Sequence, residues 1–257
     1  MIDAHAHLTD EAFQSDLDEV VNSARNAGIE AIINPGTDLL TSEKAITLAA
    51  RYLGFVFPAA GIHPHDAAAA GPDAPQRLKE LLGAPGIIGI GETGLDYYRA
   101  LSPRAVQRTL FETHVELALE TGLPIIVHVR EAAADAFEIL SAHPGVTGMM
   151  HSFSEGPEFA EKFLSLGLFI SFSAILTYPK AEAVRQAARV VPLDRFLVET
   201  DAPYLPPQSR RGRRCEPANV VETARKFAEI RNLSLEEVGR AAADNARRLF
   251  RIPVPVA

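Results

Sequence analysis

The chain has 257 residues, and 47% of them are apolar, which is enough for one large core. Its length is near that usual for an α/β barrel, about 250 residues. We therefore expect a single domain over residues 1–257. The formal net charge of −8 argues against the broad basic surface that proteins binding nucleic acid nonspecifically have. A single cysteine, Cys215, excludes a disulfide framework and a cysteine-rich zinc module.

Apolar runs and amphipathic segments alternate along the chain. The runs are rich in Ile, Val, Leu and Phe, and they predict strands at residues 2–4, 31–34, 55–60, 87–91, 124–127, 147–150, 168–171 and 196–199. Helical spacing predicts helices at 10–27, 42–52, 75–82, 103–121, 132–142, 157–166, 180–190, 217–230 and 235–250. Repeated strand–helix alternation predicts an α/β fold, a closed parallel (β/α)8 TIM barrel.

Side chains that bind metals stand at the ends of these strands. They are His5, His7, Glu92, His128, His151 and Asp201. Because parallel strands of a barrel end at one mouth, we expect these side chains to meet at the C-terminal ends of the strands.

The types of these side chains predict a site for two divalent metal ions. Glu92 has two carboxylate oxygens and could bridge ions about 3.5–4 Å apart. We assign His5, His7, Glu92 and Asp201 to one ion, and Glu92, His128 and His151 to the other. Mixed nitrogen and oxygen donors fit Zn or Mn better than Mg, and the identity stays open. Asp201 could also accept the proton of the attacking water.

Further polar residues follow the same strands. We interpret His63 as a donor to a substrate phosphate or a general acid, with a structural imidazole as the alternative, and His65 as a second substrate contact. Arg130 could bind a phosphate oxygen or form a surface ion pair. Glu199 could orient a ligand or the water, or be an ordinary buried acid. His114, within a predicted helix, and His143, at the opposite end of the barrel, are predicted to be structural.

The longest irregular stretch, residues 202–216, contains a basic cluster of Arg210, Arg211, Arg213 and Arg214. A loop after the last strand belongs to the rim of the site in this architecture, so we expect Arg211 to contact substrate; a solvated loop is the alternative.

The pattern G-x-G-x-x-G at residues 89–94 resembles a dinucleotide-binding motif. That motif requires a helix directly after it, whereas the next predicted helix begins only at residue 103, so we expect no nucleotide cofactor. The sequence also lacks an apolar window long enough for a membrane span and lacks the features of a signal peptide at its start. We therefore expect a cytoplasmic protein with no membrane partner.

Several segments together resemble the TatD family of metal-dependent deoxyribonucleases, a branch of the amidohydrolase-like barrels. They read DAHAHL at residues 3–8, GIHPH at 61–65, IGETGLDYY at 90–98, PIIVHVR at 124–130, HSFS at 151–154 and ETDAPYL at 199–205, with shorter matches at 211–217 and 245–250. The resemblance implies a metal-dependent hydrolase that cleaves DNA phosphodiester bonds, in one form as a 3′ exonuclease acting on single-stranded DNA or frayed ends. It also implies the metal ligands given above.

Two other classes remain as alternatives. One is a carbon–nitrogen or ester hydrolase of the wider superfamily, such as a deaminase, lactonase or aminoacyl-tRNA deacylase. In many binuclear members of that superfamily a carbamylated lysine bridges the metals on the fourth strand, where this chain has Glu92, and this favours the nuclease. The other is a scaffold that retains metal without catalysis. The full donor set argues against it, because buried imidazoles and acids without a cation are destabilising.

Overall fold

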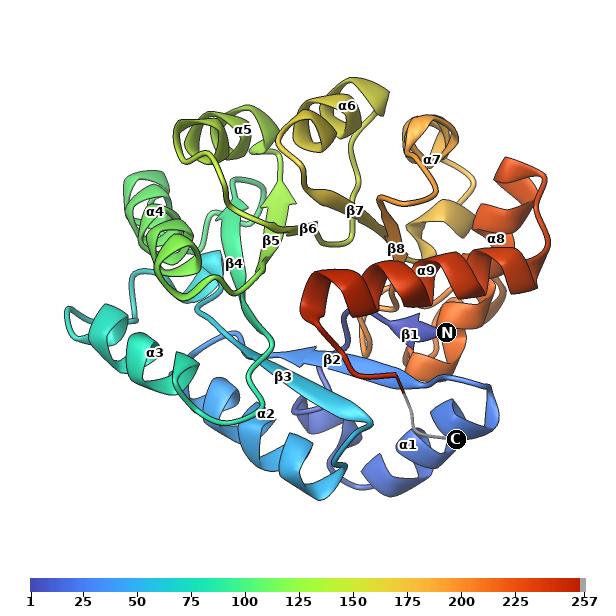
Figure 1. The fold of residues 1–257 in the computed structure, drawn as a ribbon, viewed down its shortest axis with the longest axis horizontal. Helices are drawn as coiled ribbons and strands as arrows, with labels where there is room; N and C mark the ends of the chain where they lie inside the picture. The colour runs from blue at the N-terminus through green and yellow to red at the C-terminus, as the bar shows by residue number, and fades with distance from the viewer. Residues whose placement is uncertain (255–257) are drawn as a thin grey trace.

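The structure, a computed structural model, describes residues 1–254 and contains one parallel eight-stranded sheet. Its strands follow chain order: β1 (Ile2–Asp3), β2 (Ala31–Pro35), β3 (Val56–Ala60), β4 (Gly89–Asp96), β5 (Ile125–Arg130), β6 (Gly148–Met150), β7 (Phe169–Phe172) and β8 (Phe196–Val198). The amide of Ala4 donates to the carbonyl oxygen of Val198 at 3.1 Å, and Ala6 bridges Ala202, so β8 returns to β1. The predicted TIM barrel is confirmed (Figure 1).

Helices surround this barrel (Figure 1). They are α1 (Leu17–Asn26), α2 (Leu39–Arg51), α3 (Ala74–Leu82), α4 (Arg104–Thr121), α5 (Ala133–Ala142), α6 (Pro157–Ser165), α7 (Glu182–Val190), α8 (Val220–Arg231) and α9 (Leu235–Phe250). Short 3-10 turns are η1 (Glu11–Phe13), η2 (Pro64–Asp66), η3 (Ala174–Thr177), η4 (Gln208–Arg210) and η5 (Pro217–Asn219). The start of α9 is fixed by reciprocal hydrogen bonds between Ser234 and Glu237.

Several predicted elements differ from the structure, three of them clearly. The helix predicted at residues 217–230 begins as η5 and continues as α8. The helix predicted at residues 10–27 is divided into η1 and α1, because the side chain of Asp10 caps a separate turn by accepting from the amide of Ala12. The strand predicted at 87–91 is instead β4, which begins at Gly89 and continues to Asp96. Its polar second half is buried and paired with β5, so it resembles a loop only in composition.

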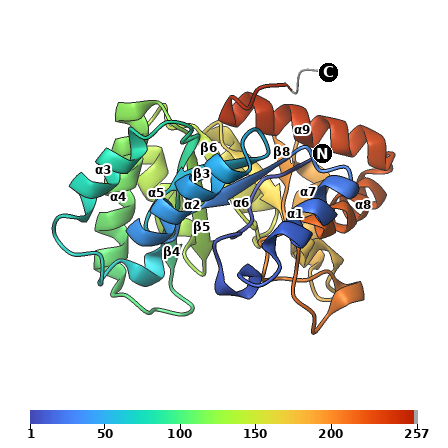
Figure 2. The same cartoon turned by 90° about the horizontal axis from the view of Figure 1, so that it is seen from below.

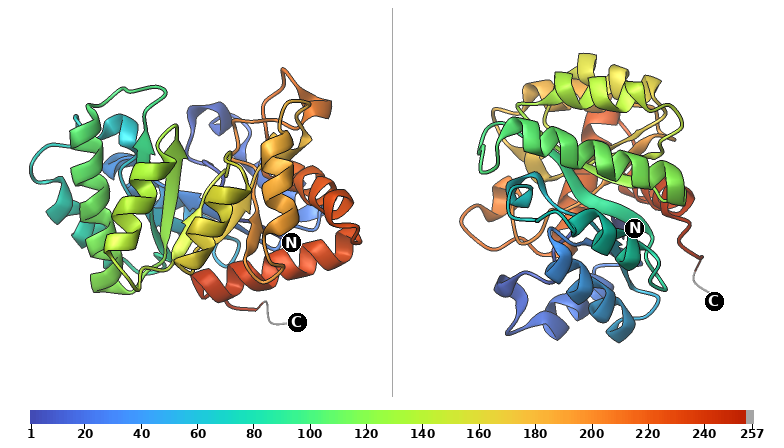
Figure 3. Two further views of the ribbon diagram at one scale, coloured as in Figure 1. Left: turned by 90° about the horizontal axis from the view of Figure 1, so that it is seen from above. Right: turned by 90° about the vertical axis from the view of Figure 1, so that its left-hand side faces the viewer.

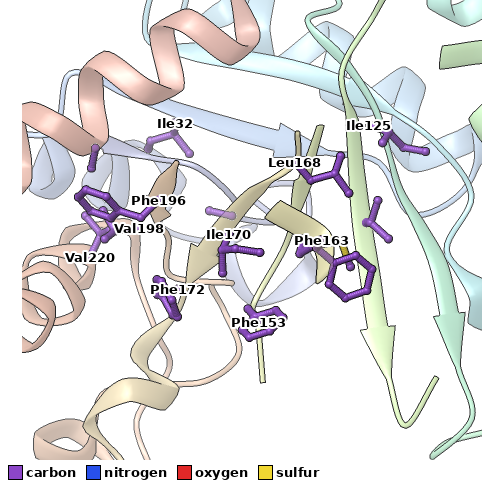
Figure 4. Close-up of a cluster of buried hydrophobic side chains, with 14 of the residues drawn as sticks. Ile32, Ile125, Phe153, Phe163, Leu168, Ile170, Phe172, Phe196, Val198 and Val220 are labelled. Carbon is purple, nitrogen blue, oxygen red and sulfur yellow. The ribbon is translucent and has the colours of Figure 1, made fainter. Parts of the chain in front are cut away.

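The core fills two regions. Apolar side chains between the strands and the outer helices form the larger region, part of which is drawn in Figure 4 with Phe163, Ile170, Phe172 and Phe196. The smaller region lies at the N-terminal ends of the strands, where α9 packs against residues such as Ile2, Ile126 and Leu197. Asn245 of α9 donates to the carbonyl oxygen of Phe196 at 2.8 Å and anchors the helix there.

The two ends of the barrel therefore differ in what covers them. Figures 2 and 3 show α9 on one end and the long loop after β8, drawn in orange, on the other. Loops that follow strands converge at this second end, which is the mouth predicted from the sequence. Within residues 1–254, no helix is long and apolar enough to cross a membrane.

Candidate metal centre

Backbone hydrogen bonds join the segments that follow β1 and β8. The amide of Asp201 donates to the carbonyl oxygen of His5 at 2.9 Å, and the amide of His7 donates to that of Ala202 at 2.7 Å. The backbone of Asp201 has φ 58°, a left-handed conformation that is uncommon for a residue with a side chain. These contacts fix His5, His7 and Asp201 beside one another although they are far apart in sequence.

Four donor atoms come together here. His5 Nε2 and His7 Nε2 are 3.0 Å apart, and Glu92 Oε2 lies 3.3 and 3.2 Å from them. Asp201 Oδ1 is 3.8 Å from His5 Nε2 and 3.5 Å from His7 Nε2. Donor atoms about 2.1 Å from a shared ion lie about 3 to 3.5 Å from one another. The donor atoms of His5, His7 and Glu92 have this spacing, and Asp201 Oδ1 lies slightly farther from His5 in a compact group with His5 and His7. Together they form the set that the sequence assigns to the first ion.

The other oxygen of Glu92 faces a second set of imidazoles. Glu92 Oε1 lies 2.9 Å from His128 Nδ1, 3.2 Å from His151 Nε2 and 3.3 Å from His63 Nε2. The compact groups of donors are His63, Glu92 and His128 on one side and His5, Glu92 and His151 in the middle. The structure thus places His63, interpreted above as a substrate contact, within the second donor set. His151 lies between the two sets, and its ring stacks on that of His5 with centroids 3.7 Å apart.

Two glycines allow this close approach of the strands. A Cβ atom on Gly61 would lie 2.5 Å from the Cα of Gly91, and one on Gly94 would lie 2.0 Å from the carbonyl oxygen of His128. A side chain at either position would push β4 away from its neighbours, and β4 carries Glu92.

The charges within the cluster suit a cation. Burial alone would raise the pKa of Glu92, but the imidazoles of His151, His63 and His5 hold it well below the usual value. Burial alone would lower the pKa of His7, but hydrogen bonds with Asp201 and Glu92 raise it to about 10. Burial lowers the pKa of His63 to about 4, which leaves a neutral ring able to donate a lone pair. Ionised carboxylates and shared protons at this spacing fit divalent cations, which would replace those protons.

Glu199 is fully buried beside the cluster. One of its oxygens accepts from the amide of Ser152 and lies 2.8 Å from His151 Nδ1, and the hydroxyl of Ser171 donates to the other. A carboxylate at Nδ1 fixes the tautomer of the ring and leaves the lone pair of Nε2 facing Glu92. The two interpretations of Glu199 left open by the sequence therefore agree: it is a hydrogen-bonded buried acid, and it orients His151.

Asp96 is a residue of the centre that the sequence analysis missed. Asp96 Oδ2 lies 2.8 Å from His65 Nε2 and 3.3 Å from His128 Nε2, and the amide of Arg99 donates to Oδ1 at 2.7 Å. It gives His65 a carboxylate partner that is not obvious in the sequence. Strand alternation could have found it, because Glu92, Gly94 and Asp96 are every second residue of β4.

The remaining histidines lie outside the cluster. His114 on α4 is buried, with Nδ1 2.8 Å from the carbonyl oxygen of Leu110, and it accepts the amide of Ile62 at 3.0 Å through Nε2. His143 follows α5, and its Nδ1 lies 2.8 Å from the carbonyl oxygen of Ile139. Both have the structural positions that the sequence analysis predicts. The glycine-rich pattern at residues 89–94 lies wholly within β4, and α4 begins only at Arg104, so it has no dinucleotide-binding geometry.

Arginines of the rim divide into two kinds. Arg214 pairs with Asp16 at 2.6 Å and Glu216 at 3.0 Å, and Arg210 pairs with Glu222 at 3.1 Å. These two arginines hold the loop. The guanidinium of Arg211 instead lies 4.9 Å from the ring centroid of Tyr178, and that of Arg130 lies 4.1 Å from that of Tyr98. Within residues 1–254, neither Arg130 nor Arg211 forms an ion pair with a carboxylate.

Comparison with known proteins gives the family. The model of the family described as TatD-related DNase matches residues 2–251. This chain belongs to the TatD family. It is 36% identical to the uncharacterized metal-dependent hydrolase YabD of Bacillus subtilis, over 98% of this chain and 99% of that one. It is 35% identical to the 3′-5′ ssDNA/RNA exonuclease TatD of Erwinia billingiae, over 98% and 100% of the two chains.

A solved structure agrees. The crystal structure of YJJV, a TatD homologue from Escherichia coli K12, is 27% identical and has a TM-score of 0.93 over 98% of each chain. Membership of the TatD family and the donor cluster together make this chain a metal-dependent hydrolase.

Proposed function

We propose that this protein hydrolyses phosphodiester bonds of DNA with the help of two divalent ions, acting on single strands or frayed ends. The observation that carries the proposal is the position of Glu92, whose two oxygens face two different sets of donors. A bridging carboxylate of this kind is typical of binuclear phosphodiester hydrolases, in which the ions lie about 3.5–4 Å apart. Relatives named 3′-5′ ssDNA/RNA exonuclease support a nucleic-acid strand as the substrate and cleavage from its 3′ end.

The proposed ligands follow from the geometry. His5, His7, Glu92 and Asp201 would hold one ion, and Glu92, His128 and His151 the other, with His63 as a further donor to that second ion. This gives His63 a ligand role in place of the phosphate contact expected from the sequence. Zn and Mn fit the mixed donors best. When bound, such a pair would lower the pKa of water and offset the charge that develops on the phosphate.

The chain's own residues would supply the rest of the reaction. The side chain of Asp201 is 14% exposed, whereas that of Glu92 is 3% exposed, so Asp201 is the carboxylate that water and substrate can reach, and we propose it as the general base. Glu199 would hold His151, and Asp96 would hold His128 and His65, in fixed orientations. Arg130 and Arg211, which have no carboxylate partner within residues 1–254, would bind phosphates of the strand.

The alternative reaction, hydrolysis of carbon–nitrogen or carboxylic ester bonds, has weaker support. Glu92 stands on β4 in the position where many enzymes of that kind use a modified lysine. Both reactions can be compared in one assay series.

The test is hydrolysis of a 3′-labelled single-stranded oligodeoxynucleotide and of a lactone and an amide substrate, each with Zn²⁺, Mn²⁺ or Mg²⁺, before and after chelation. We expect cleavage of the oligonucleotide that chelation abolishes and added metal restores. Cleavage of only the lactone or the amide would overturn the proposed substrate class. Cleavage that survives chelation would overturn the metal-dependent mechanism.

A further inference from the structure

Two adjacent tyrosines follow β4 and differ in their surroundings. Tyr97 donates its hydroxyl to Asp135 at 2.7 Å, and Arg104 lies over its ring, so Tyr97 joins the loop to α4 and α5. Tyr98 is 56% exposed, and within residues 1–254 its hydroxyl has no hydrogen-bond partner. Tyr97 therefore has a structural role in joining these elements, whereas the contacts of Tyr98 give it no such role.

One face of the Tyr98 ring is held by Arg130. The guanidinium carbon of Arg130 lies 4.1 Å from the ring centroid, a cation–π contact that fixes the plane of the ring. With one face covered and more than half of the residue exposed, the opposite face of the ring is open to solvent. The result is a flat, exposed aromatic surface with the positive charge of Arg130 beneath it.

This pair lies close to the metal centre. Arg130 follows His128 by two residues on β5, and it is in register with Asp96, which contacts both His65 and His128. Side chains two apart on a strand point to the same side and are separated by about 6.6 Å along it. Arg130 thus lies on the same side of β5 as His128 and farther from the centre of the cluster. The ring of Tyr98 lies against its guanidinium at the rim.

We propose that Tyr98 and Arg130 form a nucleotide subsite, in which a base of the substrate strand stacks on the open face of Tyr98 while a phosphate of the same strand binds the guanidinium of Arg130. The inference rests on the proposed function and specifies how the strand is held. Aromatic rings accept any base, because every base has a π-face, whereas bases inside a duplex are already stacked on one another. The subsite therefore selects single-stranded or frayed ends without selecting a sequence.

The test is a scan with abasic nucleotides. Single-stranded oligodeoxynucleotides lacking one base at successive positions from the 3′ end are cleaved by the wild-type enzyme and by Tyr98→Ala. With the wild-type enzyme, loss of the base at one position should raise KM by about 5- to 100-fold, the usual effect of losing one base–aromatic stack. Tyr98→Ala should raise KM for the intact strand by a similar factor and show no further penalty at that position.

Two variants serve as controls. Tyr98→Phe keeps the ring and should behave as the wild type at every position. Leu53→Ala removes an apolar side chain that is even more exposed, at 88%, between α2 and β3 at the opposite end of the barrel, and it should retain the full penalty at the sensitive position. If the abasic penalty persists in Tyr98→Ala, or if no position is sensitive in the wild type, the subsite is overturned.

The subsite and the reaction can fail separately. A wild-type enzyme that cleaves no phosphodiester with any of the three metals overturns the proposed function. In that case, the Kd values of the intact and abasic oligonucleotides for the wild type and Tyr98→Ala, measured by fluorescence anisotropy, still decide whether Tyr98 stacks a base. Loss of the abasic effect in Tyr98→Ala supports the subsite in that assay, and additive effects overturn it.

Discussion

The two ends of the barrel are built from the same strands, and their central side chains are buried to the same degree, yet their chemistry is opposite. Phe250 of α9 and Glu92 of β4 are each 2% exposed. Phe250 belongs to an apolar cluster with Ile126 and Leu197, whereas imidazoles and carboxylates surround Glu92. Because all strands run in one direction, the apolar end can stabilise the fold while the polar end, which costs stability without a cation, is left for chemistry.

The largest expected effect is at the polar end. Glu92→Gln removes the charge that faces both donor sets, so kcat on single-stranded DNA should fall by about 10³-fold or more. The variant should stay folded at the assay temperature, although its melting temperature in chelator should be lower than that of the wild type, because the imidazoles that hold the pKa of Glu92 down stabilise its ionised form in the fold. His143→Ala, at the other end of the barrel, is the control and should keep kcat and KM. Turnover retained by Glu92→Gln would show that Glu92 does not bridge.

The opposite result is expected at the apolar end. Phe250→Ala leaves a cavity between α9 and the strand starts, so the free energy of unfolding should fall by about 3–5 kcal/mol, as measured by urea denaturation. In the temperature range where the variant is folded, kcat should match the wild type. If Phe250→Ala loses activity at temperatures where it is still folded, the two ends of the barrel are coupled.

His114 lies outside both ends and supports the mouth through the backbone of Ile62. Its Nε2 accepts a hydrogen bond from the amide of Ile62, and burial lowers the pKa of the ring to about 4, so the ring is neutral when the protein is folded. The unfolded ring binds a proton below about pH 6.5. Stability should therefore fall as the pH falls from about 6.5 to about 4, by up to about 3 kcal/mol from this residue.

Urea denaturation in chelator across this pH range checks the His114 prediction. His114→Gln should show a weaker pH dependence than the wild type, by up to one proton bound on unfolding. Equal slopes in the two proteins would show that His114 is not kept neutral by the fold.

Glu199 sharpens the comparison further, because it is a fully buried acid whose role is to hold a ligand. Glu199→Gln should weaken metal binding by about 10- to 100-fold, measured by titration calorimetry, since His151 would lose the carboxylate that fixes its tautomer. Asp3→Asn is a matched control: Asp3 is equally buried, and it accepts from the hydroxyl of Thr200 and from the backbone amides of Thr200 and His5, but within residues 1–254 it contacts no imidazole ring. Equal losses in the two variants would point to a general effect of buried acids.

The sequence predicts the fold well because each strand is an apolar run with a clear end. It misjudges β4, whose second half contains Glu92, Gly94 and Asp96 and resembles a loop in composition. Those residues are polar because they form the site, and their backbone is nonetheless paired with β5. A functional strand is thus where composition is least informative about structure.

The donor cluster is also foreseeable, since strand ends share one mouth, but its internal grouping is not. Which oxygen of Glu92 faces His63, and which nitrogen of His128 faces Asp96, depends on side-chain rotations. The division of the basic loop is likewise set by distant partners: Arg214 meets Asp16, which is remote in sequence. The sequence pattern places these arginines at the mouth, but it does not show which of them pair with a carboxylate and which can bind substrate.

The smallest expected effect tests that division of the loop. Replacing Arg211 and Arg213 by Gln, with Arg210 and Arg214 retained, removes charge from the mouth without breaking the ion pairs that hold the loop. KM for single-stranded DNA should rise a few-fold, and the slope of log KM against log salt should decrease by about 0.7 for each lost phosphate contact.

Replacing Arg240 and Arg251, on and after α9 at the apolar end, removes the same charge and should leave that slope unchanged. If both pairs lower the slope equally, substrate attraction depends on the net charge of the molecule. If only the Arg211 and Arg213 pair lowers it, the strand runs over this loop, and phosphate binding belongs, like the metal centre, to one end of the barrel.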